Sequence, residues 1–190
     1  MPKRKQTAMT AERILKDENL RVGYVRDDGS CWWYAFAAHM NLYKPTTKRF
    51  GNLPNPTLEE RVAANSVRQL LVSTHGEHIS KSTDYEGNRA EEDFMGAYGG
   101  ISELQTLASL FCVNVMLWDR RSSKMMTCPM HKWEVIKANG RSCFMNADDI
   151  RRFLDTDSNQ TVHMSWSKIR DSHFDTLLTP ERLSNDSKAE

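Results

Sequence analysis

One of the four cysteines stands where a nucleophile would be expected. Cys31 follows Asp28-Gly29-Ser30, residue types that are typical of a turn leading into a helix N-cap. The residues from Trp32 to Ala38 are apolar and include neither Gly nor Pro, which predicts a buried helix with Cys31 in its first turn. The N–H groups and positive dipole of a helix N-terminus stabilise an anion, and the thiolate is the form of cysteine that attacks carbonyls. An inert core cysteine at a helix start is the alternative.

A cysteine nucleophile needs a base, and the sequence contains six histidines. His173 and Asp175 are spaced i and i+2 in a predicted strand, so their side chains should share one face. The Asp175 carboxylate is expected to accept the Nδ1–H of His173 and to leave Nε2 for the thiol. If Asp175 does not orient the imidazole, Asn159 or Asp171 is the next candidate. A surface His and Asp on an edge strand is the alternative reading of this pair.

The other histidines fit the role of base less well. His39 lies two helical turns after Cys31, about 12 Å along the axis, which is too far for the two side chains to pair. His163 alternates with apolar residues in a predicted strand, which is typical of a structural side chain. Cys128 and His131 form a lone Cys-x-x-His, whereas a structural zinc site needs four ligands. We therefore expect neither a metal nor an organic cofactor.

The composition predicts a single domain in a reducing compartment. A chain of 190 residues with 39% hydrophobic and 27% charged residues can bury one substantial core. The net charge of +1 gives no global field that would favour nucleic acid or an anionic membrane. The cysteines lack paired spacing, and the sequence shows neither a signal peptide nor an apolar run long enough to cross a bilayer. These features predict a cytoplasmic location.

Helices dominate the first half of the sequence. We expect a short helix from Thr10 to about Leu20, an irregular loop over 43–56, and a long helix opened by a capping box at Thr57-Leu-Glu-Glu60. The long helix has a predicted apolar stripe of Leu58, Val62, Val67, Leu70 and Leu71. A shorter helix is predicted over 88–98. A second capping box, at Ser102, predicts a helix over 102–111 with a buried face of Leu104, Leu107, Ala108 and Phe111.

Strands dominate the second half. The segment from Cys112 to Trp118 is apolar and β-rich, as expected of a central strand, and Cys112 and Cys143 should be buried in strands and unreactive. Further strand candidates lie over 21–25, 132–137, 141–145, 161–166 and 174–178, with a short helix or turn over 148–154. The predicted fold is α+β, with helices packed around a central, mostly antiparallel sheet. We expect a tail and short helix over 1–19, the domain over 20–180, and a polar tail over 181–190.

Three ordered motifs resemble those of the ovarian-tumour (OTU) family of cysteine proteases. The segment Asp28-Gly29-Ser30-Cys31, followed by an aromatic helix, is similar to the nucleophile motif of that family. The segment beginning at Tyr98, YGGISELQTLA, resembles the central Trp-Gly-x-x-x-Glu-Leu-x-x-Leu-Ala segment. The segment Ser172-His173-Phe174-Asp175 resembles the terminal His-aromatic-Asp/Asn motif. The resemblance covers about residues 20–180.

The resemblance implies a papain-like OTU fold and hydrolysis of the bond that follows the C-terminal glycine of ubiquitin. Cys31 would be the nucleophile, His173 the general base and Asp175 the group that orients the base. Asp28, together with the backbone N–H of Cys31 and its neighbours, would shape the oxyanion site. The sequence departs from the family pattern at Trp32-Trp33, where Leu or Phe and then an aromatic residue are usual, and at Tyr98, where Trp is usual.

A substrate tail that ends in Gly-Gly fits a narrow cleft, because glycine allows close backbone approach. Trp32 or Trp33, Tyr98 and Trp166 are the bulky residues expected to wall such a cleft, and Gly99-Gly100 would let the tail come near. For the two tryptophans, filling the core is the alternative role, since each ring buries a large apolar area.

The sequence thus favours a deubiquitinase that forms an acyl-enzyme on Cys31, with ubiquitin or polyubiquitin as its protein substrate. Two other hypotheses remain open. One is an OTU-fold module that binds ubiquitin without turnover. The other is a viral or bacterial cysteine protease, acting on a polyprotein, on host proteins or on ubiquitin-like modifiers, which would place it in the host cytoplasm. We expect the chain to act as a monomer.

Overall fold

The computed structural model describes residues 10–26, 31–48, 56–79, 101–119, 133–167 and 173–184. Over these residues the strands form one six-stranded sheet in the order β1-β6-β5-β2-β3-β4. The strands are β1 (Arg21–Gly23), β2 (Asn114–Asp119), β3 (Trp133–Ile136), β4 (Ser142–Met145), β5 (Thr161–Ser167) and β6 (His173–Leu178). Only the β2–β5 pair is parallel, and the other four pairs of neighbours are antiparallel. The predicted mostly antiparallel sheet is therefore confirmed.

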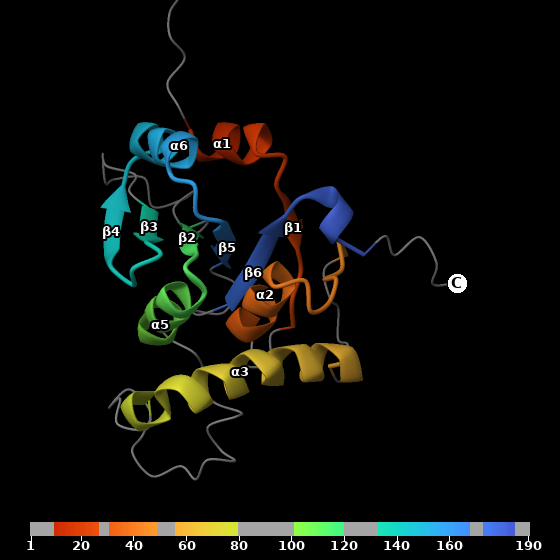
Figure 1. Ribbon diagram of the computed structural model, residues 1–190. Coiled ribbons are helices and arrows are strands. Elements are labelled where there is room, and N and C mark those ends of the chain that lie inside the picture. Colours follow the sequence, from red (N-terminus) through yellow and green to blue (C-terminus); the bar gives the residue numbers. More distant parts are fainter. Residues whose placement is uncertain are drawn as a thin grey trace, which may run out of the picture.

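Helices cover both faces of this sheet (Figure 1). In the described residues they are α1 (Ala11–Asp17), α2 (Cys31–His39), α3 (Leu58–Ile79), α5 (Ile101–Phe111), α6 (Ala147–Thr156) and a short 3-10 helix, η2 (Pro180–Arg182). Helices α1 and α6 lie on one side of the sheet, and α2, α3 and α5 lie on the other. This arrangement is the α+β class that the sequence predicts. The helix predicted over 88–98 lies outside the described residues.

Strand β2 shows why the sheet needs cover on both faces. Val115 and Leu117 belong to the hydrophobic cluster beneath α2, α3 and α5. Met116 and Trp118 belong to the second cluster, beneath α1 and α6. Successive side chains of a strand point to opposite faces, so a continuous apolar run is buried only when both faces are covered. The uninterrupted apolar sequence of this strand therefore matches its central place in the sheet.

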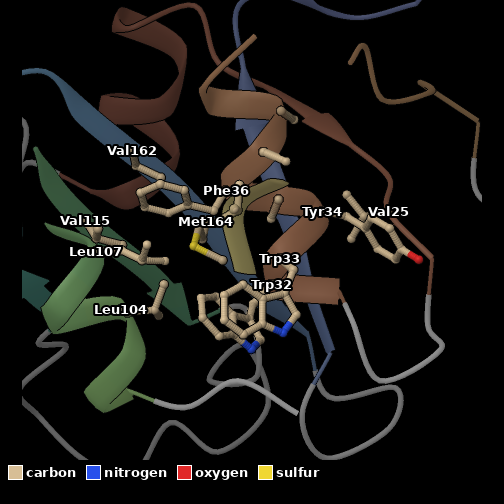
Figure 2. Close-up of a cluster of buried hydrophobic side chains, with 14 of the residues drawn as sticks. Val25, Trp32, Trp33, Tyr34, Phe36, Leu104, Leu107, Val115, Val162 and Met164 are labelled. Atoms are coloured by element: carbon tan, nitrogen blue, oxygen red, sulfur yellow. The ribbon is translucent and has the colours of Figure 1, made fainter. Parts of the chain in front are cut away.

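Helix α2 forms the core of the larger layer (Figure 2). Its residues are all buried, none with more than 3% of its surface exposed. The rings of Trp32 and Trp33 stack with centroids 3.7 Å apart, and the ring centroids of Phe36 and of Phe111 in α5 lie 5.7 Å apart. Both indoles thus fill the core, which is the alternative that the sequence left open for them. A helix packed on all sides holds its first residue, Cys31, in a fixed place.

Helix α3 begins with the predicted capping box but buries a different face. The N–H of Thr57 donates to Oε2 of Glu60 at 2.6 Å, and the N–H of Glu60 donates to Oγ1 of Thr57 at 3.2 Å. The predicted apolar stripe is wrong at three positions, since Leu58, Val62 and Leu70 are 71%, 55% and 41% exposed. The buried face consists of Glu60, Ala63, Ala64, Val67, Arg68 and Leu71. Small alanines let α3 approach α2 closely, and this face also includes charged residues.

The junction between α5 and β2 differs from the sequence expectation. Helix α5 begins at Ile101, so Ser102 lies inside the helix and is not its N-cap. Leu104, Leu107 and Ala108 are buried as predicted. Cys112 is exposed and has a positive φ of 52°, so it ends the helix in a left-handed turn and is not part of β2. The expected buried strand position of Cys112 is therefore wrong, and Cys143 in β4 is only half-buried.

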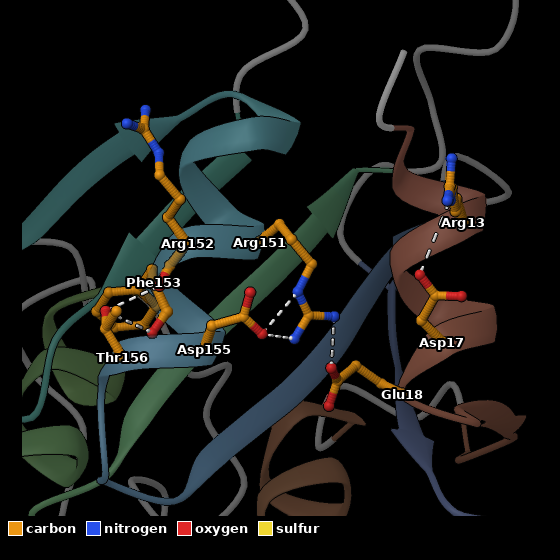
Figure 3. A network of polar contacts seen from close by, with 8 residues as sticks. All are labelled: Arg13, Asp17, Glu18, Arg151, Arg152, Phe153, Asp155 and Thr156. Atoms are coloured by element: carbon orange, nitrogen blue, oxygen red, sulfur yellow. Dashed lines mark hydrogen bonds and ion pairs between the residues drawn. The ribbon is translucent and has the colours of Figure 1, made fainter. Parts of the chain in front are cut away.

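The first helix is tied to the opposite side of the sheet from α2. Its N-cap Thr10 accepts the N–H of Arg13, and Ile14 is fully buried in the cluster that includes Ile150 of α6. Arg151 of α6 donates to Glu18, the C-cap of α1, at 2.8 Å, and also pairs with Asp155 (Figure 3). Residues 10–18 are therefore part of the packed structure.

The chain beyond residue 180, expected to be a polar tail, is structured as far as Ser184. Leu183 is buried in the core with 4% of its surface exposed. Arg182 donates to the backbone oxygens of Ala38 and His39 at 3.1 and 2.5 Å, and so caps the C-terminus of α2. The last turn of a helix leaves carbonyl groups without intrahelical partners, and a cation there also matches the helix dipole. In the described parts of the chain, no helix is both long and apolar enough to cross a membrane.

Candidate active site

The thiol of Cys31 lies at the N-terminus of α2, next to the start of β6. Cys31 is the first residue of the helix, as predicted, and is 3% exposed. The backbone N–H of Phe174 donates to its Sγ at 3.4 Å. Strand β1 pairs with β6 only from Thr176 to Leu178, so it does not extend to Phe174, and Cys31 lies against this part of β6 instead. The sulfur therefore accepts a backbone donor while it sits at the positive end of a helix.

His173 and Asp175 meet as the spacing predicts. Nε2 of His173 lies 3.0 Å from Oδ1 of Asp175, and both residues belong to β6. The predicted choice of ring nitrogen is wrong, because Asp175 engages Nε2 and not Nδ1. Nδ1 is then the nitrogen that is left for the thiol, and Cys31 is close enough to raise the pKa of the imidazole. The roles of the two nitrogens are exchanged, while the order thiol, imidazole, carboxylate is retained.

The surroundings of His173 favour its protonated form. Burial by itself lowers the pKa of this imidazole, because it disfavours the charged form. The hydrogen bond to Asp175, together with the interactions of the imidazole with the charges of Asp175 and Cys31, outweighs burial and raises the pKa to about 10. At neutral pH the imidazole therefore holds its proton. An imidazolium beside the sulfur is the countercharge that a thiolate nucleophile needs.

Asp175 is held by a backbone contact that the sequence does not reveal. Its side chain is nearly inaccessible, and the residue is 3% exposed. Besides His173, its Oδ1 accepts the backbone N–H of Val25 at 3.3 Å. Val25 lies two residues beyond the end of β1 and 150 positions away in the chain. A buried carboxylate that accepts two hydrogen bonds has a restricted orientation, which suits a group that must orient an imidazole.

The remaining predicted site residues are placed as follows. Asp28, Tyr98 and Gly99-Gly100 lie outside the described residues, as does Asp171. Trp166 belongs to β5, and its backbone pairs with that of Phe174, the residue between His173 and Asp175. The backbone of Trp166 therefore lies next to the site. Asn159 hydrogen-bonds to Asp157 in the turn before β5 and does not act on His173.

Two other histidines form a separate, structural contact. Nε2 of His39 lies 2.9 Å from the backbone oxygen of His163, and Nδ1 of His163 accepts the indole N–H of Trp118 at 3.2 Å. Burial is the main cause that lowers their pKa, to about 3 for His39 and about 4 for His163. Both rings are neutral at physiological pH and neither reaches the thiol. Cys128 and His131 lie outside the described residues, and the residues that are described hold no cluster of potential metal ligands.

No protein-family model and no curated protein sequence matches the chain. Its structure is similar to that of an OTU deubiquitinase from Wolbachia pipientis wMel, at 17% identity and a TM-score of 0.47, covering 88% of this chain and 93% of the other. An OTU deubiquitinase from Wolbachia pipientis wMel bound to ubiquitin gives 18% identity and a TM-score of 0.48, covering 86% of this chain and 98% of the other. The OTU domain of OTUD1 gives 15% identity and a TM-score of 0.48, covering 88% of this chain and 91% of the other.

These structural likenesses are partial, with identities below 20% and TM-scores below 0.5. The geometry of Cys31, His173 and Asp175 is therefore the main evidence for a chemical function.

Proposed function

We propose that this chain is a cysteine-type hydrolase that cleaves the bond after the C-terminal glycine of ubiquitin. The observation that carries the proposal is a helix-terminal thiol bound at the start of β6, the strand that also holds an imidazole paired with a buried carboxylate. Nε2 of His173 lies 3.0 Å from Asp175, and the Cys31 sulfur accepts the N–H of Phe174 at 3.4 Å. A nucleophile, a base and a group that orients the base are what thiol-dependent acyl transfer requires.

The acylation step follows from this geometry. The Cys31 thiolate attacks the carbonyl carbon of the terminal glycine, and a tetrahedral intermediate forms with its negative charge on the former carbonyl oxygen. Backbone N–H groups at the start of α2 are suited to stabilise that oxyanion. His173, protonated at neutral pH, then donates its proton to the leaving amine. The C–N bond breaks, the amine departs, and ubiquitin remains attached to Cys31 as a thioester.

Hydrolysis of the thioester reverses the role of His173. The neutral imidazole accepts a proton from a water molecule, and the resulting hydroxide attacks the thioester carbonyl. The C–S bond breaks, the ubiquitin C-terminus leaves as a carboxylic acid that loses its proton to the solvent, and the thiolate–imidazolium pair re-forms. Asp175 keeps its charge and its contact with Nε2 through both steps, so the imidazole turns neither during proton transfer nor between the two steps. No metal or organic group takes part in this scheme.

The choice of ubiquitin as substrate is supported by the sequence motifs. The segments around Cys31, Tyr98 and His173 occur in the order found in OTU proteases. We propose that Tyr98, Gly99-Gly100 and Trp166 form the slot for the substrate tail, with Asp28 at the oxyanion site. We further propose that the protein acts as a monomer in a reducing compartment, where a free thiolate persists.

A panel of diubiquitins of defined linkage tests the proposal. Purified wild-type protein should release monoubiquitin from at least one linkage, whereas the Cys31→Ala variant should bind the same chains without cleaving them. Binding by the wild type with no cleavage of any linkage would favour the alternative of a ubiquitin-binding module. Cleavage by Cys31→Ala would show that another group performs the chemistry.

A further inference from the structure

A buried ion pair lies just before the nucleophile in the chain. Nε of Arg26 donates to Oε2 of Glu60 at 2.6 Å, and the two side chains are only 10% and 11% exposed. Arg26 follows the end of β1, while Glu60 lies in the first turn of α3. The pair therefore joins the segment that leads toward Cys31 to the helix that packs on α2.

Glu60 is a fixed anchor for this arginine. Its Oε2 also accepts the N–H of Thr57 at 2.6 Å, and its own N–H donates to Oγ1 of Thr57. The capping box thus holds the Glu60 side chain in one orientation before any contact with Arg26 is considered. Because the carboxylate cannot swing freely, the arginine bound to it is also held, and with it the backbone at residue 26.

That stretch of backbone holds the carboxylate of the active site. The N–H of Val25, the residue before Arg26, donates to Oδ1 of Asp175 at 3.3 Å. The ladder between β1 and β6 ends at the Gly23–Thr176 pair, so Val25 is not held by the sheet. The N–H of Tyr24 donates to the oxygen of Thr46 at 2.8 Å, which ties the segment on one side. The contact between Arg26 and Glu60 ties it on the other.

The phenol of Tyr43 shows that the ion pair and Asp175 are within electrostatic reach of one group. Burial raises the pKa of Tyr43, the negative charges of Glu60 and Asp175 raise it further, and Arg26 lowers it. Glu60, Arg26 and Asp175 therefore all lie close enough to this buried ring for their charges to act on its pKa.

We propose that Arg26 and Glu60 are positioning residues, which hold the Val25 N–H against Asp175 and so keep Asp175 aligned with His173. Stability alone is a weak reason for such a pair, because replacing a buried ion pair with apolar groups often leaves stability unchanged or improves it. A role in alignment accounts for the location of the ion pair. Arg26 follows Val25, whose N–H binds Asp175, and Glu60 is held by the capping box of α3. This inference rests on the proposed thiol chemistry, but it can be tested without ubiquitin.

The test measures the alkylation of Cys31 by iodoacetamide as a function of pH, with each cysteine followed by mass spectrometry of its peptide. Glu60→Gln is the main variant, because glutamine keeps the capping box with Thr57 but removes the charge that binds Arg26. Arg151→Gln is the matched control, because it breaks the 2.8 Å pair with Glu18 on the other side of the sheet. Exposed Cys112 serves as the internal reference in every sample.

We expect Glu60→Gln to slow the alkylation of Cys31 at pH 7 by about tenfold or more, since small misplacements of reacting groups cost up to about a hundredfold. The alkylation rate of Cys112 should stay the same, and Cys31 of the Arg151→Gln variant should be alkylated at the wild-type rate. Among the described residues, the charged groups that act on His173 are Cys31 and Asp175, so the pH profile reports on this triad.

A folded Glu60→Gln variant with the wild-type rate and profile at Cys31 overturns the positioning role. If Glu60→Gln does not fold, Arg26→Lys provides the same test, because lysine keeps the charge and loses the fixed planar donor. Slower alkylation of Cys31 in a folded Arg26→Lys variant supports the positioning role, and an unchanged alkylation rate refutes it. If wild type fails to cleave ubiquitin while Glu60→Gln still slows alkylation, the proposed function fails and the positioning role stands.

Discussion

The charge on Asp175 should set the pH at which activity is lost on the alkaline side. His173 must hold its proton to stabilise the thiolate and to protonate the leaving amine. Activity is therefore present below the pKa of His173 and disappears as the pH rises through it. With the pKa raised to about 10, the upper limb of kcat/KM in the wild type should lie near pH 10.

Replacing Asp175 by Asn removes the charge while leaving an amide oxygen as an acceptor. A hydrogen bond to a charged group contributes about 1.5–3 kcal/mol, and one pH unit corresponds to about 1.4 kcal/mol. The upper limb should therefore fall by about one to two pH units, to roughly pH 8–9. Burial of His173 acts in the same direction, because it disfavours the imidazolium once the carboxylate is gone.

The assay is hydrolysis of ubiquitin that carries a C-terminal fluorogenic leaving group, measured between pH 6 and 10.5. Thermal unfolding at each pH ensures that a loss of rate is not a loss of fold. An upper limb in Asp175→Asn that coincides with that of the wild type, or lies above it, would refute the assignment of Asp175 as the partner that charges His173.

Three further predictions concern the scaffold and the substrate. Gly23→Ala should lower the free energy of unfolding in urea by about 1–3 kcal/mol, because a Cβ there would lie 2.7–2.9 Å from Pro45, Leu183 and Thr176. An unchanged urea midpoint would show that these neighbours move to make room for the added methyl group. Arg182→Ala should lower the free energy of unfolding by about 2–3 kcal/mol, because the carbonyl groups at the C-terminus of α2 lose their charged donor. An unchanged urea midpoint would mean that water replaces the arginine. Tyr98→Ala should raise KM for ubiquitin substrates and spare the thermal midpoint, whereas the reverse pattern would place Tyr98 in the core.

The parts of the site that depend on local sequence could be predicted. A turn followed by a fully apolar segment indicates a buried helix, and this locates Cys31 at its start. Spacing of i and i+2 in a strand brings His173 and Asp175 together. These patterns act over a few residues, so neighbouring residue types suffice to predict them.

The parts that depend on distant contacts could not be predicted. The donors from Val25 to Asp175 and from Phe174 to Cys31 join residues 150 and 143 positions apart, and any residue type has a backbone N–H. The ring nitrogen that faces Asp175 is set by a side-chain torsion, which spacing does not determine. The large apolar residues of α3 indicate the wrong face, because its buried face consists mainly of alanines and charged residues such as Glu60 and Arg68.

Reaction with a ubiquitin probe that carries a C-terminal electrophile tests the central claim most directly. We expect a single covalent adduct, located by peptide mass spectrometry on Cys31, and no adduct with Cys31→Ala. Cys112 is exposed and so checks for nonspecific alkylation, because a reagent that merely seeks accessible thiols would modify it first. Labelling that survives Cys31→Ala, or an adduct on Cys112 in the wild type, would contradict the assignment of Cys31 as the nucleophile.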